Sequence, residues 1–546
     1  MLSLGVTYSA AADFVVQVGV YTDEGYAREA VEALRDAGFP AREQPFVSAT
    51  GREMIRVLVG PFGALREADA ALDRLRSAGR RGFVRSVAPA AGSVSRPSPP
   101  SGITGGEATV PPPPVPALEI PREPAPPADA LFALDLTEGP VKPRLDGYFQ
   151  TEMAYTTPSP GHLSKARQTL ELTGTGRWGS WAKWHLSGRL AYDAVFDLND
   201  YYPSRVREDQ RTEATLRETY LDLSSGAWDF RLGRQHIIWG EMVGLFFADV
   251  VSAKDLREFV LPDFDYLRIP QWAARAEYFK GDFHGELVWI PYQSYDEIGV
   301  PGAEYYPYPP APPAGYGYVI QPEQRPGHGL ENSGYGARLS FVRSGWDVSG
   351  FYYGSVDAAP YFSRRVVTSP VPAFIYTPDH DRVRQLGGTV SKDLTAAVLR
   401  AEAIYTWDRW FNVDDLADVD GVVRQDTLDA VVGIEFPLPR ASRLNLQYFL
   451  RWYTNYDSAI FFQDEVEGGV SIYASTEISG GSIEPRLLLI SSVNRRDWMA
   501  SPEILWHLGG HWRVSIGADV FGGSATGLFG RYDRSDRLNA EARYIF

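Results

Sequence analysis

The sequence predicts a mainly β fold, in which a small α+β domain precedes an antiparallel transmembrane β-barrel of about 18 strands. Three observations lead to this fold class. Residues 145–546 alternate apolar and polar side chains with the two-residue period of a strand. Short turns, most of them containing Gly or Pro, separate strand pairs, and longer polar or aromatic connections lie between the pairs. No run of about 20 apolar residues occurs, which excludes helical membrane spans but is compatible with a barrel, whose strands face lipid only at alternate positions.

The composition of the 546-residue chain narrows its class further. Aromatic residues make up 13% of the chain, with 30 Tyr and 14 Trp, as the interfacial girdles of a membrane barrel require. The chain has no Cys, which suits the oxidising cell envelope and excludes disulfides and thiolate chemistry. The net charge of -16 argues against a nucleic-acid partner. A chain of this length is expected to hold two domains.

Residues 1–12 are largely apolar and end in small residues, a pattern typical of the end of a signal peptide and its cleavage site. No basic segment precedes them. We expect these residues to be the remnant of a signal peptide, either because the true translation start lies upstream or because the leader is truncated.

Residues 13–88 have the pattern of a small α+β module. The expected order is strand, helix, strand, helix and strand, over residues 14–21, 26–37, 53–59, 64–78 and 82–87. Length and spacing predict two βαβ-like halves with the helices on one face of the sheet.

Two segments of this module carry a resemblance to a known family. They are Val-Gln-Val-Gly-Val-Tyr at 16–21 and Arg-Val-Leu-Val-Gly-Pro-Phe at 56–62, each followed by a predicted helix. Together they resemble the SPOR (sporulation-related repeat) domain, which implies binding of peptidoglycan glycan strands that lack stem peptides, on the sheet face without helices. Strand parity puts Gln17, Tyr21 and Arg56 on that face, where an aromatic ring and polar donors suit a sugar chain. The alternative is that these are simply exposed strand residues.

Residues 89–140 are rich in Pro and poor in bulky apolar residues, and they include four consecutive Pro at 111–114. Such a segment cannot form a core and stays extended. We expect a disordered linker that lets the first domain sample the periplasm away from the membrane.

Eight short turns divide the remaining chain, residues 141–546, into strand pairs. They lie at 178–181, 224–227, 280–282, 343–345, 392–394, 437–440, 479–482 and 508–511. The longest connections lie near 194–212, 239–270, 291–333 and 356–382. Short turns on one side and long loops on the other are typical of outer-membrane barrels. Eight turns imply nine hairpins and about 18 strands, and an even count puts both ends of the barrel on the short-turn side, expected to be the periplasm.

The alternation assigns barrel residues to two faces. Because a charge facing lipid costs about 2–4 kcal/mol at the membrane midplane, the parity that carries the charges is expected to face a wet lumen. The residues expected to line the pore are Arg275, Glu277, Arg338, Arg400, Glu402, Arg451, Arg486, Glu503, Arg513 and Asp519. Arg and Glu are mixed, so no preference for anions or cations follows. The alternative is that many of these charges pair with each other and hold the wall.

The strand at Arg537–Phe546 places Leu, Ala, Ala, Tyr and Phe on one face and mostly polar residues on the other. A terminal strand with this pattern resembles the closing strand of bacterial outer-membrane barrels. In that family the terminal aromatic belongs to the signal read by the barrel-assembly machinery, so the resemblance implies this role for Tyr544 and Phe546.

Several motifs between residues 216 and 270 carry a second resemblance. They are Leu216–Leu223, Leu232–Gln235, Trp239-Gly240, Asp255–Phe259, Leu261–Phe264 and Arg268–Pro270. They look like a family of outer-membrane barrels of unknown function akin to alginate-export porins, which implies a large pore and no known reaction. The long connection after Trp239 mixes apolar and acidic residues, a composition that permits it to fold into the lumen as a constriction.

Catalytic signatures are missing from the sequence: it has no Gly-x-Ser-x-Gly, His-Glu-x-x-His or phosphate-binding loop. We therefore expect no enzyme activity, no cofactor and no metal. The sequence favours an outer-membrane porin or channel for hydrophilic solutes, tethered to peptidoglycan. The expected partners are peptidoglycan glycan strands, outer-membrane lipid and the barrel-assembly machinery. The alternatives are a structural envelope anchor with a plugged barrel and a polysaccharide export pore.

Overall fold

The computed structural model describes two parts of the chain. They are residues 13–21, 38–47, 53–62 and 83–87 with several helical residues between them, and residues 144–546 except 180, 243–247, 263, 395, 416, 440 and 462–463. The chain divides into two compact units, Met1–Glu119 and Ile120–Phe546. The expected signal-peptide remnant and the expected linker lie outside the described residues. None of the described helices is both long enough and apolar enough to cross a membrane.

The first unit contains one antiparallel sheet of four strands in the order β2-β3-β1-β4. Its strands are β1 (Asp13–Tyr21), β2 (Ala41–Val47), β3 (Glu53–Phe62) and β4 (Phe83–Val87). Val16, Val57 and Val59 of the sheet are fully buried against apolar residues of the helical segments, among them Leu34 and Leu75. The core of the unit therefore lies on one face of the sheet, as the helical spacing predicts.

Strand β2 was not expected from the sequence. It contains Pro45, which lowers the prediction of a strand because Pro cannot donate to a ladder hydrogen bond. In the structure β2 is an edge strand that pairs only with β3 among the described strands, a position that tolerates Pro.

The second unit is a closed antiparallel barrel of 18 strands. In chain order they are β5 (Arg144–Thr156), β6 (His162–Trp178), β7 (Ala182–Asp193), β8 (Thr212–Ser225), β9 (Trp228–Gln235), β12 (Gln271–Lys280), β13 (Phe283–Tyr292), β15 (Gly334–Arg343), β16 (Trp346–Val356), β19 (Arg382–Asp393), β20 (Val398–Asn412), β21 (Val422–Leu438), β22 (Ser442–Tyr453), β23 (Val466–Ser475), β24 (Ile483–Ser492), β25 (Trp498–Leu508), β26 (Trp512–Gly522) and β27 (Arg537–Ile545). The wall closes where β27 pairs with β5, from Arg537 opposite Thr156 to Ile545 opposite Tyr148. The predicted fold class and strand number are confirmed.

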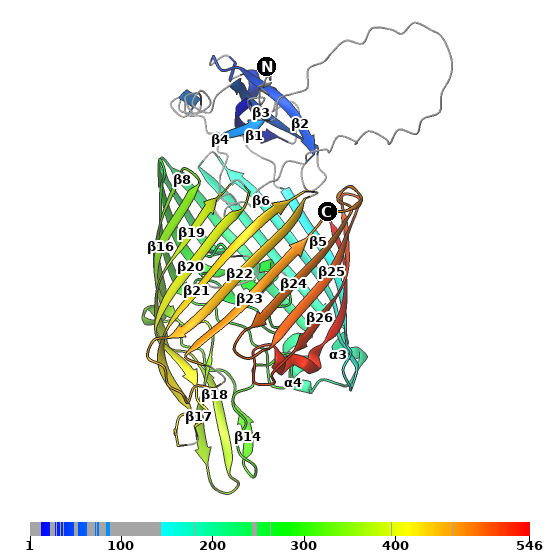
Figure 1. Ribbon diagram of the computed structural model, residues 1–546, viewed down its shortest axis with the longest axis vertical. Helices are drawn as coiled ribbons and strands as arrows, with labels where there is room; N and C mark the ends of the chain where they lie inside the picture. The colour runs from blue at the N-terminus through cyan, green and yellow to red at the C-terminus, as the bar shows by residue number, and fades with distance from the viewer. Residues whose placement is uncertain are drawn as a thin grey trace, which may run out of the picture. The chain divides into compact units, whose positions relative to one another are not determined.

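All eight predicted turns join neighbouring barrel strands at one end, here called the short-turn end. The opposite, long-connection end carries short elements: α3 (Val195–Leu198), α4 (Ser204–Gln210), β10 (Ala253–Lys254), α5 (Phe264–Leu267), β11 (Arg268–Ile269), β14 (Gly317–Ile320), β17 (Tyr361–Val367), β18 (Ala373–Asp379) and the 3-10 turns Leu330–Asn332 and Gly530–Ser535. The small sheet β14-β18-β17 projects beyond this end (Figure 1). The first and last barrel strands both begin or end at the short-turn end.

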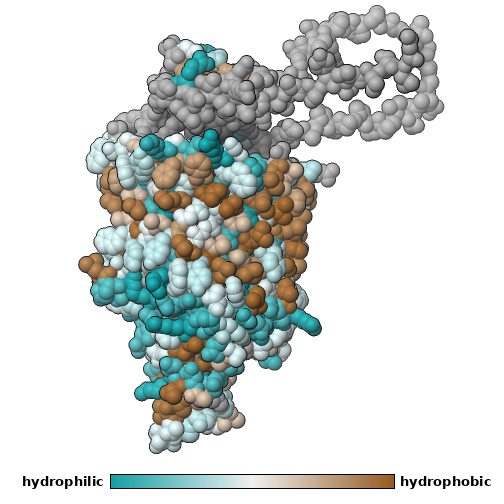
Figure 2. All heavy atoms as spheres, turned by 60° about the vertical axis from the view of Figure 1, so that its left-hand side comes forward, coloured by the Kyte–Doolittle hydropathy of each residue, from teal (hydrophilic) through white to brown (hydrophobic). Residues whose placement is uncertain are grey.

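The outer wall is apolar. On the face seen in Figure 2, hydrophobic side chains gather over the barrel wall, whereas the long-connection end is largely hydrophilic. Exposed aromatic residues near the short-turn end include Trp178, Trp228, Phe283, Trp346 and Trp512. Those near the long-connection end include Tyr155, Tyr192, Tyr292, Tyr335 and Trp452.

These aromatic residues form two girdles at a spacing that suits a membrane. On β13, Phe283 and Tyr292 belong to opposite girdles and lie nine residues apart. At about 3.4 Å per residue and a tilt of about 40°, that distance spans about 23 Å along the barrel axis, close to the ~25 Å apolar band of outer-membrane barrels. Phe546 is 44% exposed, and its ring stacks 6.2 Å from that of Tyr544, so both residues of the expected assembly signal lie in the short-turn girdle.

Candidate functional site: the lumen and the segment that crosses it

The connection between β9 and β12, residues 236–270, is here called the luminal segment. Its described residues, 236–242, 248–262 and 264–270, enter the barrel. Its first part is attached to the inner wall by Glu402 on β20, which is 3% exposed. The Glu402 carboxylate accepts backbone N–H bonds from Met242 and Ala248, both at 2.9 Å, and a third from Glu241. A carboxylate that accepts several N–H bonds is a strong anchor for a backbone.

Apolar packing secures the same part of the luminal segment. Ile237, Trp239, Ala248 and Val251 are almost fully buried. They form one cluster with inward-facing side chains of β12, β13, β16 and β20, namely Ala273, Val288, Ile290, Phe351, Tyr353 and Ile404. This wall of the lumen is therefore dry where the segment covers it.

The second part of the luminal segment is held by charge. The carboxylate of Glu258 lies 2.8 Å from Lys165, 2.9 Å from Arg167 and 3.0 Å from Arg537. Burial raises the pKa of Glu258, but the three cations outweigh burial and hold this pKa well below its usual range. The neighbouring Arg257 pairs with Glu213 of β8 at 2.6 Å.

The two attachments lie on opposite walls. Along the closed sheet, β20, which carries Glu402, and β6, which carries Lys165, are nine strands apart in either direction. In an 18-stranded barrel these strands face each other across the full diameter. The luminal segment therefore crosses the interior of the barrel and narrows it.

A cavity of about 420 Å³ lies beside the charged part of the luminal segment. Of the described residues, eight basic and seven acidic side chains line it, which makes it polar without a strong net charge. Tyr266 of the luminal segment lies between two cations, with its ring centre 4.6 Å from Arg189 and 5.2 Å from Arg543. The cavity offers a solute both charged groups and an aromatic face.

Five of the ten residues expected to line the pore are buried: Arg275, Glu277, Arg338, Glu402 and Asp519. Arg338 donates to Ser349 at 3.2 Å, and Asp519 accepts from Arg537 at 2.8 Å. Glu402 holds the luminal segment. These side chains occupy the inward-facing positions of their strands, but they bind other groups of the protein.

The other five, Arg400, Arg451, Arg486, Glu503 and Arg513, keep partial exposure. Arg400 pairs with Glu435 at 2.7 Å and Arg451 with Asp429 at 2.6 Å. Arg486, Glu503 and Arg513 line the 420 Å³ cavity together with Asp519. Arg513 makes no salt bridge with a described carboxylate.

Glu277, His284 and Glu286 bring three potential metal ligands within 4.8 Å of one another. Arg275 lies among them, 2.8 Å from each of the two carboxylates. Because the guanidinium already forms ion pairs with both carboxylates, this group is a buried ion-pair network on the wall.

The structure describes the expected glycan-binding residues only in part. Arg56 is half-buried, whereas the side chains of Gln17 and Tyr21 lie outside the described residues. The backbone register pairs Gln17 with Leu58 and, after an irregularity, Tyr21 with Ile55. The assignment of these three residues to peptidoglycan stays a prediction.

Sequence reasoning missed Lys165, Arg167 and Arg537 as luminal residues. The available signal was parity: Lys165 and Arg167 alternate with apolar Ala166 within β6. Their common partner Glu258 lies 93, 91 and 279 residues away, so no local pattern links the four.

Two family models match parts of the chain. Residues 10–86 match the family described as SPOR domain, so the N-terminal unit is a SPOR domain as expected. Residues 164–285 match a family described as protein of unknown function (DUF1302), a segment that contains the motifs between residues 216 and 270. The likeness to alginate-export porins in particular stays a prediction. No curated protein sequence matches the chain.

The fold has similar solved structures among bacterial outer-membrane proteins. Acinetobacter baumannii OccAB4 is 8% identical, with a TM-score of 0.44 over 74% of this chain and 98% of that chain. Pseudomonas aeruginosa OccK2, solved in complex with glucuronate, is 10% identical, with a TM-score of 0.44 over 74% and 98%. Salmonella typhi OmpF, solved with daunomycin, is 10% identical, with a TM-score of 0.36 over 75% and 100%.

Proposed function

We propose that the chain is an outer-membrane channel for small hydrophilic solutes, tethered to peptidoglycan by its N-terminal SPOR domain. The channel is non-enzymatic, its short-turn end faces the periplasm, and its SPOR domain lies there. Support comes from the closed 18-stranded wall, its two aromatic girdles and the charged residues on its inner parity.

The crossing of the lumen by residues 236–270 is the observation that favours small solutes. A polymer in transit would have to pass a segment that is fixed to opposite walls by Glu402 and Glu258. The 420 Å³ cavity beside it falls in the range of ~300–1,000 Å³ that holds one small molecule. These dimensions favour small solutes over a polysaccharide.

Within this channel, we propose that Arg486, Glu503 and Arg513 contact the solute. All three line the cavity and remain partly exposed. The residues that instead hold the wall or the luminal segment are buried and bound by protein groups, namely Arg275, Glu277, Arg338, Glu402 and Asp519. Arg486 also pairs with Glu484, at 2.9 Å, but it stays partly exposed to the cavity.

A second candidate is an envelope anchor whose barrel is plugged. The buried anchoring of the luminal segment favours it, because a well-packed crossing element can close a pore as well as narrow it.

Conductance across a planar bilayer tests the two candidates. The full-length protein is expected to give small unitary currents, and swelling of proteoliposomes is expected in monosaccharides but not in oligosaccharides. The Arg513→Gln variant should shift ion preference towards cations, whereas Arg325→Gln, on an external ion pair, should not. A folded wild type without current, in which loosening the luminal segment by Glu402→Gln also yields none, would contradict the channel and support the anchor.

The tether has a separate test. Full-length protein in detergent is expected to bind amidase-treated sacculi more tightly than untreated ones, because glycans without stem peptides are the proposed ligand. The Arg56→Ala variant should bind more weakly than Arg28→Ala, which alters a helical residue of the same unit. Equal binding to both kinds of sacculi would contradict recognition of denuded glycans.

A further inference from the structure

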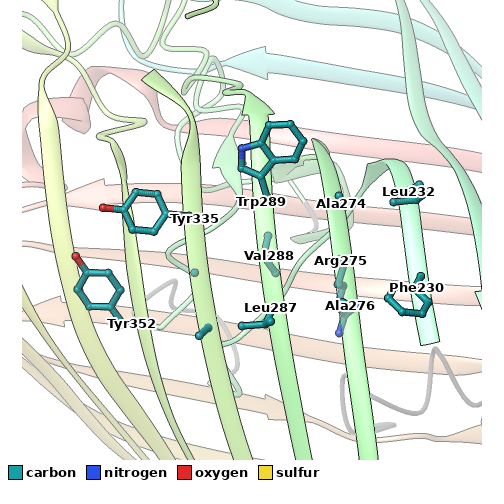
Figure 3. Close-up of a pocket in the computed structure, with 12 residues that line it drawn as sticks. Phe230, Leu232, Ala274, Arg275, Ala276, Leu287, Val288, Trp289, Tyr335 and Tyr352 are labelled. Atoms are coloured by element: carbon teal, nitrogen blue, oxygen red, sulfur yellow. The ribbon is translucent and has the colours of Figure 1, made fainter. Parts of the chain in front are cut away.

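An apolar groove of about 440 Å³ lies on the outer wall across β9, β12, β13, β15 and β16 (Figure 3). Small outward residues form its floor: Ala274 and Ala276 on β12 and Ala337 on β15. Large side chains flank them: Phe230, Leu232, Leu287, Trp289 and Tyr335 are exposed, and Tyr352 is half-buried. The alternate residues Arg275, Val288 and Arg338 are 4–5% exposed, so the groove belongs to the lipid-facing parity.

The strand register divides this groove into two troughs. Ala276 pairs with Phe230 on one side and with Leu287 on the other. The small side chains of β12 therefore form a shallow trough between the larger side chains of β9 and β13. Ala337 pairs with Leu287 and with Tyr352, which repeats the arrangement on β15. Figure 3 shows Trp289 and Leu287 between the pair Phe230 and Leu232 and the pair Tyr335 and Tyr352. Two parallel apolar troughs fit the acyl chains of one lipid.

Cations stand at the long-connection end of the groove. Arg382 and Arg384 share the outward parity of Leu386, which is 52% exposed. The guanidinium carbon of Arg382 lies 6.0 Å from the centre of the Tyr335 ring. Tyr335, Gly354 and Arg384 form one cross-strand row, and a Cβ on Gly354 would lie 3.1 Å from Cζ of Tyr335. The Tyr335 ring therefore leans across Gly354 towards the cations.

Arg382 differs from its cationic neighbours in what it binds. Arg384 pairs with Asp408 at 2.6 Å, and Arg424 pairs with Asp381 at 2.7 Å. The Arg382 guanidinium donates to the backbone carbonyls of Glu331 and Ser333 and forms no ion pair with a described carboxylate. The Arg382 backbone N–H donates to the Asp381 carboxylate at 2.7 Å. A charge held at the girdle without an acidic partner attracts an anion, and a guanidinium suits phosphate.

We propose that this surface binds one molecule of the phosphorylated glycolipid of the outer leaflet, with a phosphate at Arg382 and acyl chains over Ala274, Ala276 and Ala337. The assignment rests on the proposed function, because the long-connection end must face the outside of the cell. Ordinary lipid contacts the whole wall, but here two apolar troughs lie beside a guanidinium that forms no ion pair with a described carboxylate. The site selects its lipid through the headgroup.

Native mass spectrometry of the full-length protein with added lipid A tests the proposal. Wild type is expected to retain one lipid A, and Arg382→Gln to weaken binding by about tenfold, the loss expected for a charge-assisted hydrogen bond. Arg382→Lys should fall between the two. The matched control Arg424→Gln removes a cation of the same end that is already paired with Asp381, and it should bind like wild type. Ala276→Phe fills a trough and should also weaken binding.

Three results would overturn the site. They are unchanged binding in Arg382→Gln, an equal loss in Arg424→Gln, and binding of phosphatidylglycerol with the same dependence on Arg382. Heat-modifiable migration on gels checks that each variant is a folded barrel. Binding that depends on Arg382 in a barrel without conductance would refute the channel but keep the site, whereas conductance without such binding would refute the site alone.

Discussion

The two ends of the luminal segment are attached by different chemistry. Residues 236–251 are held by apolar packing around Trp239 and by one buried carboxylate, Glu402. Residues 255–268 are held by ion pairs of Glu258 and Arg257, and the internal pair Arg268–Asp249, at 2.6 Å, links the two parts. Apolar packing responds little to salt, whereas ion pairs are screened by it, although the burial of Glu258 and its partners reduces the screening. A segment attached in this way has one attachment that does not depend on ionic strength and one that does.

The largest expected effect is the loss of Trp239. Its side chain is 1% exposed and its ring centre lies 5.2 Å from that of Phe351, so Trp239→Ala leaves a cavity in the dry attachment. We expect the local stability of residues 236–242 to fall by about 3–5 kcal/mol, independent of salt. Hydrogen exchange of these amides measures it, with the exposed turn residue Trp181→Ala as control. A loss of local stability that disappears at high salt would contradict the proposed difference between the two attachments.

The next effect is expected from Glu258→Gln, which removes one negative charge from among Lys165, Arg167 and Arg537. The amide keeps the shape of the side chain, and we expect a cost of about 3 kcal/mol at the charged attachment. Limited proteolysis at 255–262 reports it. Glu297→Gln, from an exposed pair with Arg325, should cost less than about 1 kcal/mol. Equal resistance of Glu258→Gln and Glu297→Gln to proteolysis would show that the ion pairs do not hold the segment.

Glu402→Gln is expected to cost about 2 kcal/mol, because an amide oxygen can still accept N–H bonds but without the charge. Single-channel recording is expected to show larger or noisier currents than wild type. The control Glu435→Gln alters a carboxylate of the adjacent β21 that pairs with Arg400 and does not touch the luminal segment. The same noise in both variants would assign the effect to the wall.

The smallest effect concerns pH. Burial, reinforced by Asp347, raises the pKa of Glu241 to about 7, and Arg338 and Arg400 only partly oppose this while Glu402 adds to it. A carboxyl whose pKa is higher in the folded state stabilises the fold at low pH and loses that contribution as pH rises through about 7. We therefore expect the dry attachment to loosen, and current noise to increase, between pH 5 and pH 8. Glu241→Gln should abolish this dependence; a dependence that survives it would refute the role of Glu241.

Local sequence patterns predicted the barrel wall but not the contacts made inside the barrel. The turns at 280–282 and 343–345 are short and lie between strongly alternating strands, so the count of 18 strands followed from neighbouring residues alone. Parity also put Glu402 on the inner face of the wall, and in the structure its carboxylate binds the luminal segment. It could not show that the carboxylate meets amides 154 to 161 residues away, because a connection without periodicity carries no sign of its partner.

The same limit explains the other misses. Strand β2 was not predicted because Pro45 lowers the strand propensity of this segment, and propensity takes no account of whether a strand lies at the edge of a sheet. Arg382 was unnoticed because its neighbours Glu331 and Ser333 offer backbone carbonyls, which leave no trace in composition.

The seam between β27 and β5 also sets an order of events in assembly. Glu258 meets Lys165 of β6, made early, and Arg537 of β27, made 279 residues after Glu258. Such distant contacts form slowly, and this set is complete only when the last strand joins the first. The charged attachment of the luminal segment is therefore completed only when the ring closes or afterwards. A kinetic intermediate with an open seam would carry the segment loosely attached at one end, and the final step of folding would create the wall and the constriction together.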